Sequence, residues 1–473
     1  MADTKIDAGA QAAKSSLLTL LELAALPASA ADSVDIAGAD PVFPTRYKPV
    51  APGAAAIAAT GLAAADLWAL KAGRRQQVRV NARAAAAALR SSRYLKINGK
   101  KPAEDPEKIT GFYPLRDGRW MYLHCNFFNL RDRNLTVLGA PAKRDAVTKA
   151  VATWDGLELE DAIMQAGGAC SFVRSEEEWR ALPQMHAVER LPLLEIVKIG
   201  EAPAQPLPAG GRPLAGVRVL DLTRVLAGPT CARTLAEHGA DVLRVTRRDL
   251  ADMGPTDFDT GIGKLNTHID LRVPREAETM RSLVRGCDVF SQSYRPGALA
   301  RRGLSPEALA ELRPGIVYVT LSAWGHEGTW RERRGYDTIV QSANGMAFQG
   351  NNECPAFLPY SAQDYVAGYL LAFGAMVALG RRAREGGSWL VRASLAGAGH
   401  WIRRHGLLDS SEYAHLPAEF PAEELQSLLM EHDSPVGRIT HLAPVVQMSE
   451  TPARWSRPSV PRGHHQPVWP PRG

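Results

Sequence analysis

Cysteine is scarce in this sequence, which has five cysteines in 473 residues. Their number is odd, they lie far apart, and no two of them form a Cys-x-x-Cys pair. Zinc fingers and thiol-exchange enzymes depend on such pairs. We therefore expect five reduced thiols in a cytoplasmic protein, and no metal site.

An excess of charge of one sign and long apolar runs are also lacking. The 56 Lys and Arg residues against 50 Asp and Glu residues leave a formal net charge of +6, spread along the chain. This pattern disfavours nucleic-acid binding and suits a small polyanionic ligand.

The longest uncharged apolar run, residues 365–380, is shorter than the roughly 20 residues that span a bilayer. We expect a buried helix there and no membrane span. The acidic N-terminus does not resemble an export signal.

Several catalytic motifs are missing. The glycines at 261–263 lack the spacing of a phosphate-binding loop, and Gly-x-Gly-x-x-Gly, Gly-x-Ser-x-Gly and His-Glu-x-x-His do not occur. The sequence therefore offers no support for a P-loop enzyme, a serine hydrolase of the elbow type or a zinc protease.

What is present in the second half is an alternation of strands and helices. Apolar strands are predicted at 217–223, 241–245, 288–291 and 316–321, with helices between them. This rhythm predicts an α/β fold with a parallel sheet covered by helices. A Pro- and Gly-rich stretch around 201–213 marks a domain boundary. We predict the following segments: an N-terminal extension (1–45), a small domain (46–205), a linker (206–215), an α/β domain (216–406) and a short C-terminal segment (407–473).

The first half predicts a mixed α and β segment. An Ala-rich helix over 52–70 ends at Gly73 and precedes a strand over 77–81, and residues 113–128 have the pattern of a β-hairpin with its turn at Asp117 and Gly118. Helices are predicted at 157–165 and 176–182.

A weak repeat links the two halves at a separation of 313 residues. The first copy has Gly61, Gly73, Val78 and Arg79, and the second has Gly374, Gly386, Val391 and Arg392. Both copies are predicted to be an apolar helix, a basic turn and a strand, and chance similarity between two Ala-rich units explains the repeat equally well. Where the second copy has Asp364, the first has Ala51.

Asp364 is the strongest candidate for chemistry. It stands just ahead of the apolar run 365–380, where unpaired N–H groups and the helix dipole stabilise a carboxylate. It is either a plain helix cap or a carboxylate that stays ionised at neutral pH and attacks an acyl group.

Basic residues follow the predicted strands, where α/β sheets bind ligands. Together they have the chemistry to bind a ligand with several phosphates. Tyr294 and Trp324 lie among them and either stack on a purine or fill the core. The basic residues are Arg247, Arg248, Lys264, Arg272, Arg295 and Arg301.

Five motifs in order resemble those of the family III CoA-transferases over about residues 214–395. They lie at 220–229, 239–245, 294–297 and 335–341 and at Asp364. The resemblance implies a Rossmann-like CoA-binding domain, a smaller α+β domain and an interlocked homodimer. It also implies CoA transfer between an acyl-CoA and a carboxylic acid, with coenzyme A as cosubstrate and no permanently bound cofactor.

The resemblance also implies roles for particular residues. Asp364 matches the catalytic aspartate of the family, which forms an anhydride and then a thioester with CoA. The positions that match CoA-contacting residues are Leu226, Ala227, Arg247, Ile269, Arg272, Ser293, Tyr294, Arg295 and Arg301. The chain departs from the family pattern at Ser293, where the family has Asn, and at Thr246, where it has Glu.

Residues 46–205 resemble the second half of the family, which normally follows the CoA-binding domain. We therefore expect them to supply the small domain in permuted or duplicated order.

Two alternatives remain. The α-methylacyl-CoA racemases share this fold, but their catalytic histidine corresponds to Tyr336, and a tyrosine with a pKa near 10 is a poor base. A non-catalytic CoA-binding protein is compatible with the departures at Thr246 and Ser293, whereas Asp364 argues against it.

Overall fold

A seven-stranded sheet forms the centre of the molecule. The computed structural model describes residues 2–102, 109–250, 254–350 and 353–472. The sheet consists of β7 (Glu195–Gly200), β8 (Arg218–Asp221), β9 (Asp241–Thr246), β10 (Lys264–His268), β11 (Val289–Gln292), β12 (Val317–Ser322) and β13 (Ser388–Ser394). Their order is β10-β9-β8-β11-β12-β13-β7, and only β7 is antiparallel to its neighbour. The predicted α/β fold is confirmed.

The six parallel strands have the order of a doubly wound fold. Numbered along the chain from β8, they run 3-2-1-4-5-6 across the sheet. The first of these strands, β8, therefore lies in the middle of the sheet. Strands β9 and β10 follow on one side of it, and β11, β12 and β13 follow on the other side. The gap between β8 and β11 is the point at which loops leave in opposite directions, and ligands of such sheets bind there.

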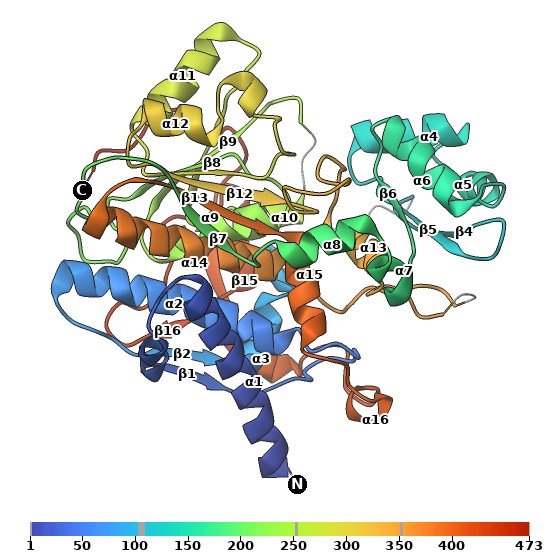
Figure 1. Ribbon diagram of the computed structural model, residues 1–473, viewed down its shortest axis with the longest axis horizontal. Helices are drawn as coiled ribbons and strands as arrows, with labels where there is room; N and C mark the ends of the chain where they lie inside the picture. The colour runs from blue at the N-terminus through green and yellow to red at the C-terminus, as the bar shows by residue number, and fades with distance from the viewer. Residues whose placement is uncertain (1, 103–108, 251–253, 351–352, 473) are drawn as a thin grey trace.

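Helices cover both faces of the sheet (Figure 1). Alternate strand residues point to opposite faces, so Val219 belongs to one apolar core and Leu220 to the other. On the Val219 face the sheet packs against α9 (Ala227–Glu237) and α14 (Ala362–Glu385). On the Leu220 face it packs against α11 (Pro274–Arg285) and α12 (Pro306–Leu312).

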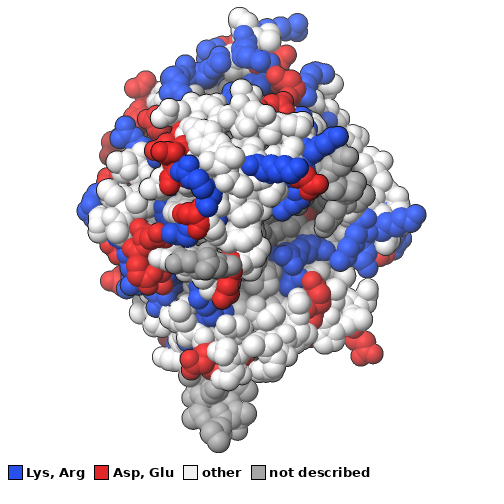
Figure 2. Space-filling view, turned by 90° about the vertical axis from the view of Figure 1, so that its right-hand side faces the viewer, with Lys and Arg blue, Asp and Glu red and all other residues white. Residues whose placement is uncertain are grey.

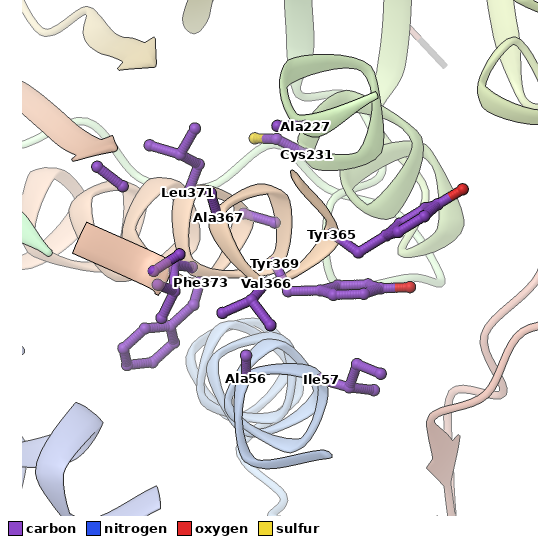
Figure 3. Packing of buried hydrophobic residues seen from close by; sticks show 14 of the residues in the cluster. Ala56, Ile57, Ala227, Cys231, Tyr365, Val366, Ala367, Tyr369, Leu371 and Phe373 are labelled. Carbon is purple, nitrogen blue, oxygen red and sulfur yellow. The ribbon is translucent and has the colours of Figure 1, made fainter. Parts of the chain in front are cut away.

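The N-terminal segment adds a further layer beyond α14. Helix α2 (Val50–Ala72) lies along α14 on the side away from the sheet, and α1 (Ala2–Leu23) packs on α2. In Figure 3, helix α14 lies between α2 and α9, and Ala56 and Ile57 of α2 are on the side of α2 that faces α14. Helices α2 and α14 are long and apolar enough to cross a membrane, but 78% and 100% of their apolar windows are buried inside the protein. Their apolar surface is used in packing.

A separate α+β lobe protrudes on the right of Figure 1. Its sheet has the order β4-β5-β6 and its own core. The predicted hairpin and its turn at Asp117 and Gly118 are confirmed. The lobe contains β4 (Gly111–Pro114), β5 (Trp120–Leu123), α4 (Phe128–Leu138), α5 (Arg144–Val151), α6 (Gly156–Gln165) and β6 (Cys170–Phe172), and α7 (Glu176–Arg180) and α8 (Pro183–Arg190) lead back to β7.

The two ends of the chain share small sheets. Strand β15 (Gly437–Leu442) pairs with β14 (Leu429–Ser434) on one side and with β3 (Lys96–Ile97) on the other. Strand β2 (Val78–Asn81) lies between β1 (Val34–Ala37) and β16 (Gln447–Met448). The remaining elements are η1 (Ala28–Ser33), α3 (Ala82–Ala88), η2 (Ser91–Tyr94), α10 (Pro255–Thr260), η3 (Ala300–Arg302), α13 (Asp337–Ala343), α15 (Leu395–Arg404), α16 (Ser410–Tyr413) and α17 (Ala422–Leu428). The C-terminal segment is thus interleaved with the N-terminal one.

The segment 46–205 does not form one packing unit. Its first part, with α2 and β2, packs on α14, and residues 109–172 form the lobe. Its last strand, β7, joins the seven-stranded sheet, because it pairs with β13 from Glu195 to Gly200. Burial of the β13 edge by this pairing was not visible in the local sequence.

The internal repeat has an equivalent packing in both copies. A Cβ on Gly61 of α2 would lie 2.7 Å from Cγ1 of Val78, and one on Gly374 of α14 would lie 2.6 Å from Cγ1 of Val391. In each copy a helix glycine thus allows the first valine of the following strand to approach closely.

The contact between α9 and α14 yields a testable prediction. A Cβ on Gly368 would lie 2.5 Å from the Ala227 carbonyl oxygen, whereas one on Gly380 of the same helix would meet mainly the end of the Arg384 side chain, at 3.1 Å. We expect G368A to lower the free energy of unfolding by about 1–3 kcal/mol through overpacking. G380A is the control, because it gains helix propensity without a clash with backbone. Urea unfolding measures both, and equal stability of the two variants would contradict this account.

Candidate active site

A cavity of about 310 Å³ opens where β8 and β11 end. It lies at the switch point of the sheet, the position at which doubly wound folds bind ligands. Its walls come from the loops after β8, β11 and β12, from the loop before α13, from the first turn of α14 and from the lobe. They include Phe127, Asn129, Leu130, Arg224, Val225, Ala227, Leu250, Ser293, Tyr294, Arg295, Leu321, Arg334, Tyr336 and Asp364.

The backbone is strained in the loop after β8. Val225 has a φ of 72°, a left-handed conformation that is a genuine outlier for a β-branched residue. Such strain is kept at functional sites when the surrounding structure fixes it. Here it lets the chain turn sharply from β8 into α9, so that Val225 and Ala227 both reach the cavity.

Asp364 is inside α14 rather than ahead of it. The helix begins at Ala362, after Ser361, whose side chain makes no capping hydrogen bond. Asp364 is therefore in the first turn. The helix begins three residues earlier than the sequence predicted, so Asp364 is not the residue just before it. Residues four apart share a helix face, so Asp364 lies on the same face as Gly368, which abuts Ala227. This places the carboxyl group beside the start of α9.

Asp337 takes the capping role that Ser361 lacks. Its Oδ2 accepts a hydrogen bond of 3.0 Å from the Asp364 backbone N–H, and its Oδ1 accepts one from the Gln341 side-chain amide. Asp337 is the first residue of α13 and is fully enclosed. It joins α13 to the first turn of α14, and it brings a second carboxyl group next to Asp364.

These two carboxyl groups do not behave as the sequence predicts. Burial raises the pKa of Asp337 to about 6, although hydrogen bonds with Asp364, Gln341 and Gln363 lower it. Burial and then the charge of Asp337 raise the pKa of Asp364 well above its ordinary value. Burial and the neighbouring acid thus oppose the ionisation of Asp364, whereas the helix terminus was expected to favour it.

The lobe supplies one wall of the cavity. The ring of His124 stacks on that of Tyr336 with centroids 4.1 Å apart, and Phe127 lies 5.6 Å from Tyr336. The Arg224 guanidinium lies over the Phe127 ring at 5.1 Å. The aromatic layer thus ties the lobe to the loop after β8 and to the loop before α13. No local signal in the sequence connects Phe127 with Asp364, which is 237 positions away.

Half of the predicted site residues line the cavity. Ala227, Ser293, Tyr294 and Arg295 lie there together with Asp364. Leu226 is buried beside Ala227 at the start of α9. The others, Arg247, Ile269, Arg272 and Arg301, lie outside this cavity at the carboxyl ends of β9 and β10 or in η3. Arg224, Arg334 and Phe127 were missed, although Arg224 stands inside one of the quoted motifs.

Two arginines of the predicted phosphate site are ion-paired. Arg247 pairs with Asp249, and Arg272 pairs with Asp249 at 3.1 Å and with Asp270 at 2.6 Å. Such exposed pairs contribute little to stability, so a phosphate could replace the carboxylates. Lys264 differs, because its ammonium group is buried and bonded to Asp221 at 2.9 Å. It is a structural residue rather than a ligand-binding one.

A metal site has no support among the residues that the structure describes. Those residues contain no cluster of three or more His, Cys, Asp or Glu side chains that could hold a metal ion.

The raised carboxyl pKa predicts the pH dependence of stability. Between the ordinary pKa of an aspartate and the raised value at Asp364, the folded protein holds more protons than the unfolded chain, so its stability falls as pH rises. We expect D364N to raise the melting temperature at pH 8 relative to the wild type, by about 2–4 °C per kcal/mol gained, and to lose this gain at pH 4. D249N is the control, since Arg247 lowers the pKa of that exposed carboxyl. A gain for D364N that does not change with pH would refute the assignment.

The chain is similar in sequence to known CoA-transferases over part of its length. The family model described as CoA-transferase family III matches residues 214–419. Acetyl-coenzyme A transferase nodX of Hypoxylon pulicicidum is 29% identical over 70% of this chain and 59% of its own length. An acyl-CoA transferase of Gibberella moniliformis is 31% identical over 61% of this chain and 55% of its own.

Shorter matches include a succinyl-CoA:glutarate CoA-transferase of Mus musculus, 33% identical over 39% of this chain and 45% of its own. Among solved structures, a CAIB/BAIF family protein from Brucella suis matches 41% of this chain and 56% of its own at 27% identity, with a TM-score of 0.38. The chain spans less than two thirds of the length of these relatives. Residues 214–419 are thus similar to CoA-transferase family III.

Proposed function

We propose that the protein transfers CoA from an acyl-CoA thioester to a carboxylic acid, with Asp364 as the nucleophile. The observation that carries the proposal is the position of Asp364. It is the acid of a cavity at the switch point of a parallel sheet, inside the region that matches the transferase family. The relatives named for CoA transfer support the same class of reaction.

The proposed reaction has two pairs of steps. The Asp364 carboxylate attacks the thioester carbonyl, and the C–S bond breaks. CoA thiolate departs, and the acyl group remains on Asp364 as a mixed anhydride. The thiolate then attacks the Asp364 carbonyl of that anhydride, which releases the donor acid and leaves an aspartyl-CoA thioester. The acceptor carboxylate attacks this thioester and expels CoA thiolate. Attack of the thiolate on the acceptor carbonyl forms the new acyl-CoA and restores the Asp364 carboxylate.

Burial suits Asp364 to this role. A carboxylate without water around it is less stabilised than one in bulk solvent, so it is a stronger nucleophile once its proton has left. The first N–H groups of α9, at Ala227 and beyond, have no side-chain cap. They are candidates for the donors that stabilise the oxyanion.

The nucleotide end of CoA is proposed to lie outside the cavity. Arg247, Arg272 and Arg301 would hold its phosphates, with Leu226 and Ile269 as apolar neighbours. The thioester would then reach inward past Ser293, Tyr294 and Arg295 to Asp364. No permanently bound cofactor or metal has a role in this scheme.

The structure gives the alternatives less support. Burial raises the pKa of Tyr336, so the residue at the position of the racemase histidine is an even poorer base than a free tyrosine. A non-catalytic CoA-binding protein would have no use for a destabilised carboxyl pair at the cavity.

We also propose that the protein is cytoplasmic and forms a homodimer. A measurement of its molar mass in solution tests the homodimer.

Trapping tests the nucleophile directly. Incubation with acetyl-CoA, succinyl-CoA or butyryl-CoA followed by hydroxylamine or mass spectrometry should reveal an acyl or CoA adduct on Asp364, and D364A should lose at least about 10³-fold in CoA transfer. D35N, at an exposed carboxyl that pairs with Arg79, should retain activity. Transfer that survives D364A would exclude the mechanism, and exchange of the α-proton without an acceptor acid would favour a racemase.

The pH profile tests the carboxyl pair. Since Asp364 must be ionised to attack, kcat/KM should fall as the pH drops through its raised pKa. D337N removes the charge that helps to raise this pKa but keeps an oxygen for the Asp364 N–H. We expect its acidic limb to move to lower pH. D161N, at an exposed carboxyl of the lobe, should leave the limb in place. An unmoved limb in D337N would mean that the two carboxyl groups are not coupled in the active enzyme.

A further inference from the structure

A second cavity lies at the end of α14 that is far from Asp364. Its volume of about 300 Å³ is close to that of the cavity at Asp364. Its walls come from the last turns of α14, from the second half of α2 and from the segment that joins α1 to η1. The two cavities have no described lining residue in common.

The inner walls of this second cavity are apolar. Helix α2 contributes Leu62 and Ala65, α14 contributes Val377, and the segment after α1 contributes Ala24 and Leu26. All of these except Leu26 are buried. Apolar cavities in proteins stay dry and take up apolar molecules, so these walls suit an alkyl chain.

The segment after α1 is held in place as a fixed wall. Ala25 lines the cavity with a φ of 47°, a left-handed conformation that is uncommon for a residue other than glycine. The Leu26 N–H donates to the Leu21 carbonyl at 2.8 Å and closes the turn on the end of α1. Arg381 Nη2 donates to the Ala24 carbonyl at 2.8 Å and fastens the turn to α14. The cavity is therefore formed before any ligand enters it.

The polar side chains of the cavity are mainly basic. Arg75, Arg381 and Arg384 line it, whereas Asp66 is the one acidic side chain among its described lining residues. Asp66 pairs with Arg384 at 2.6 Å, so it neutralises one of the three arginines. The charges of Arg75 and Arg381 are not opposed by an acid of the described cavity walls.

Arg75 has no partner in the part of the chain that the structure describes. Positive and negative side chains are interspersed over the face of the molecule in Figure 2. Arg75 differs, because no described residue gives its exposed guanidinium a hydrogen bond or an ion pair. The neighbouring Arg74 lies outside the cavity and pairs with Glu450 at 3.1 Å. The five N–H donors of the Arg75 guanidinium are thus available to a ligand.

We propose that this cavity binds a straight-chain carboxylic acid of about eight carbons, in its ionised form. At about 30 Å³ for each water-sized group, the cavity holds about ten non-hydrogen atoms, the size of octanoate. The alkyl chain lies against Leu62, Ala65 and Val377. The carboxylate accepts hydrogen bonds from Arg75, with the charge of Arg381 beside it.

The charge and the volume exclude other occupants. A neutral lipid would leave Arg75 without a partner, and a helix of a partner protein, about 10 Å across, is too wide to enter. The proposal does not depend on the reaction at Asp364.

Calorimetry on the full chain tests the class of ligand. Octanoate should bind, 1-octanol has the same chain without the charge, and butyrate has the charge with a shorter chain. We expect both to bind at least about tenfold more weakly than octanoate, because one loses charge-assisted hydrogen bonds and the other loses apolar burial. Equal affinity for either of them would overturn the proposal.

Variants of the cavity locate the site. R75Q should weaken octanoate binding at least about fivefold, and R75K should retain part of the affinity. A69L places a larger side chain at a lining position of α2 and should abolish binding. R74Q is the matched control, since Arg74 lies outside the cavity, and it should bind octanoate as the wild type does.

Unchanged octanoate affinity in R75Q or in A69L would mean that the acid binds elsewhere, for example in the cavity at Asp364, and would overturn the proposal. The melting temperature of A69L without ligand shows whether this variant is folded. R75Q changes an exposed side chain, so its result does not depend on repacking of the core.

Discussion

The close approach of α14 to α9 is the contact on which the rest of the structure depends. Gly368 allows the backbone of α14 to lie against the Ala227 carbonyl, and Asp364 is one turn away on the same face. Helix α14 is also held from its other side, since the Leu89 carbonyl accepts from the Ser361 N–H and the Tyr365 hydroxyl bonds to Ser91. Asp364 is therefore placed by a buried helix rather than by a loop.

The same burial sets the chemistry of the site. The carboxyl groups of Asp364 in α14 and Asp337 in α13 lie together at the first turn of α14, and removal of water raises the pKa of both. When these carboxyl groups are ionised, their burial lowers the free energy of unfolding, as groups at reactive sites often do. The same cavity is also lined by the guanidinium groups of Arg224, Arg295 and Arg334.

The N-terminal half contains a unit that packs in the same way as α14 and its following strand. Helix α2 has the glycine-to-valine packing of α14, and Asp40 accepts from the Ala51 N–H as Asp337 accepts from the Asp364 N–H. Ala51 has no carboxyl group, so α2 carries no counterpart of Asp364. Helix α2 packs on α14, and the lobe that follows lines the cavity with Phe127.

Local sequence was enough to predict β8, β9, β11 and β12 and the helices α9, α11 and α12, because apolar runs, glycine stops and prolines at helix starts depend on neighbouring residues. Strand β10 was not predicted. The turn at Asp117 and Gly118 and the end of α2 at Gly73 were predicted for the same reason. Asp364 was found as a candidate because its position in a motif and ahead of an apolar run is also local.

The environment of Asp364 depends on tertiary contacts. The sequence contained the local patterns that identify most strands of the sheet, Asp364 as a candidate and the basic character of the loops. It could not determine that Asp337 lies against Asp364, that Phe127 and Arg334 enter the same cavity, or that β7 closes the edge of the sheet. Those contacts join segments far apart in the chain, and their energies depend on burial, which exists only once the helices and the lobe have packed together.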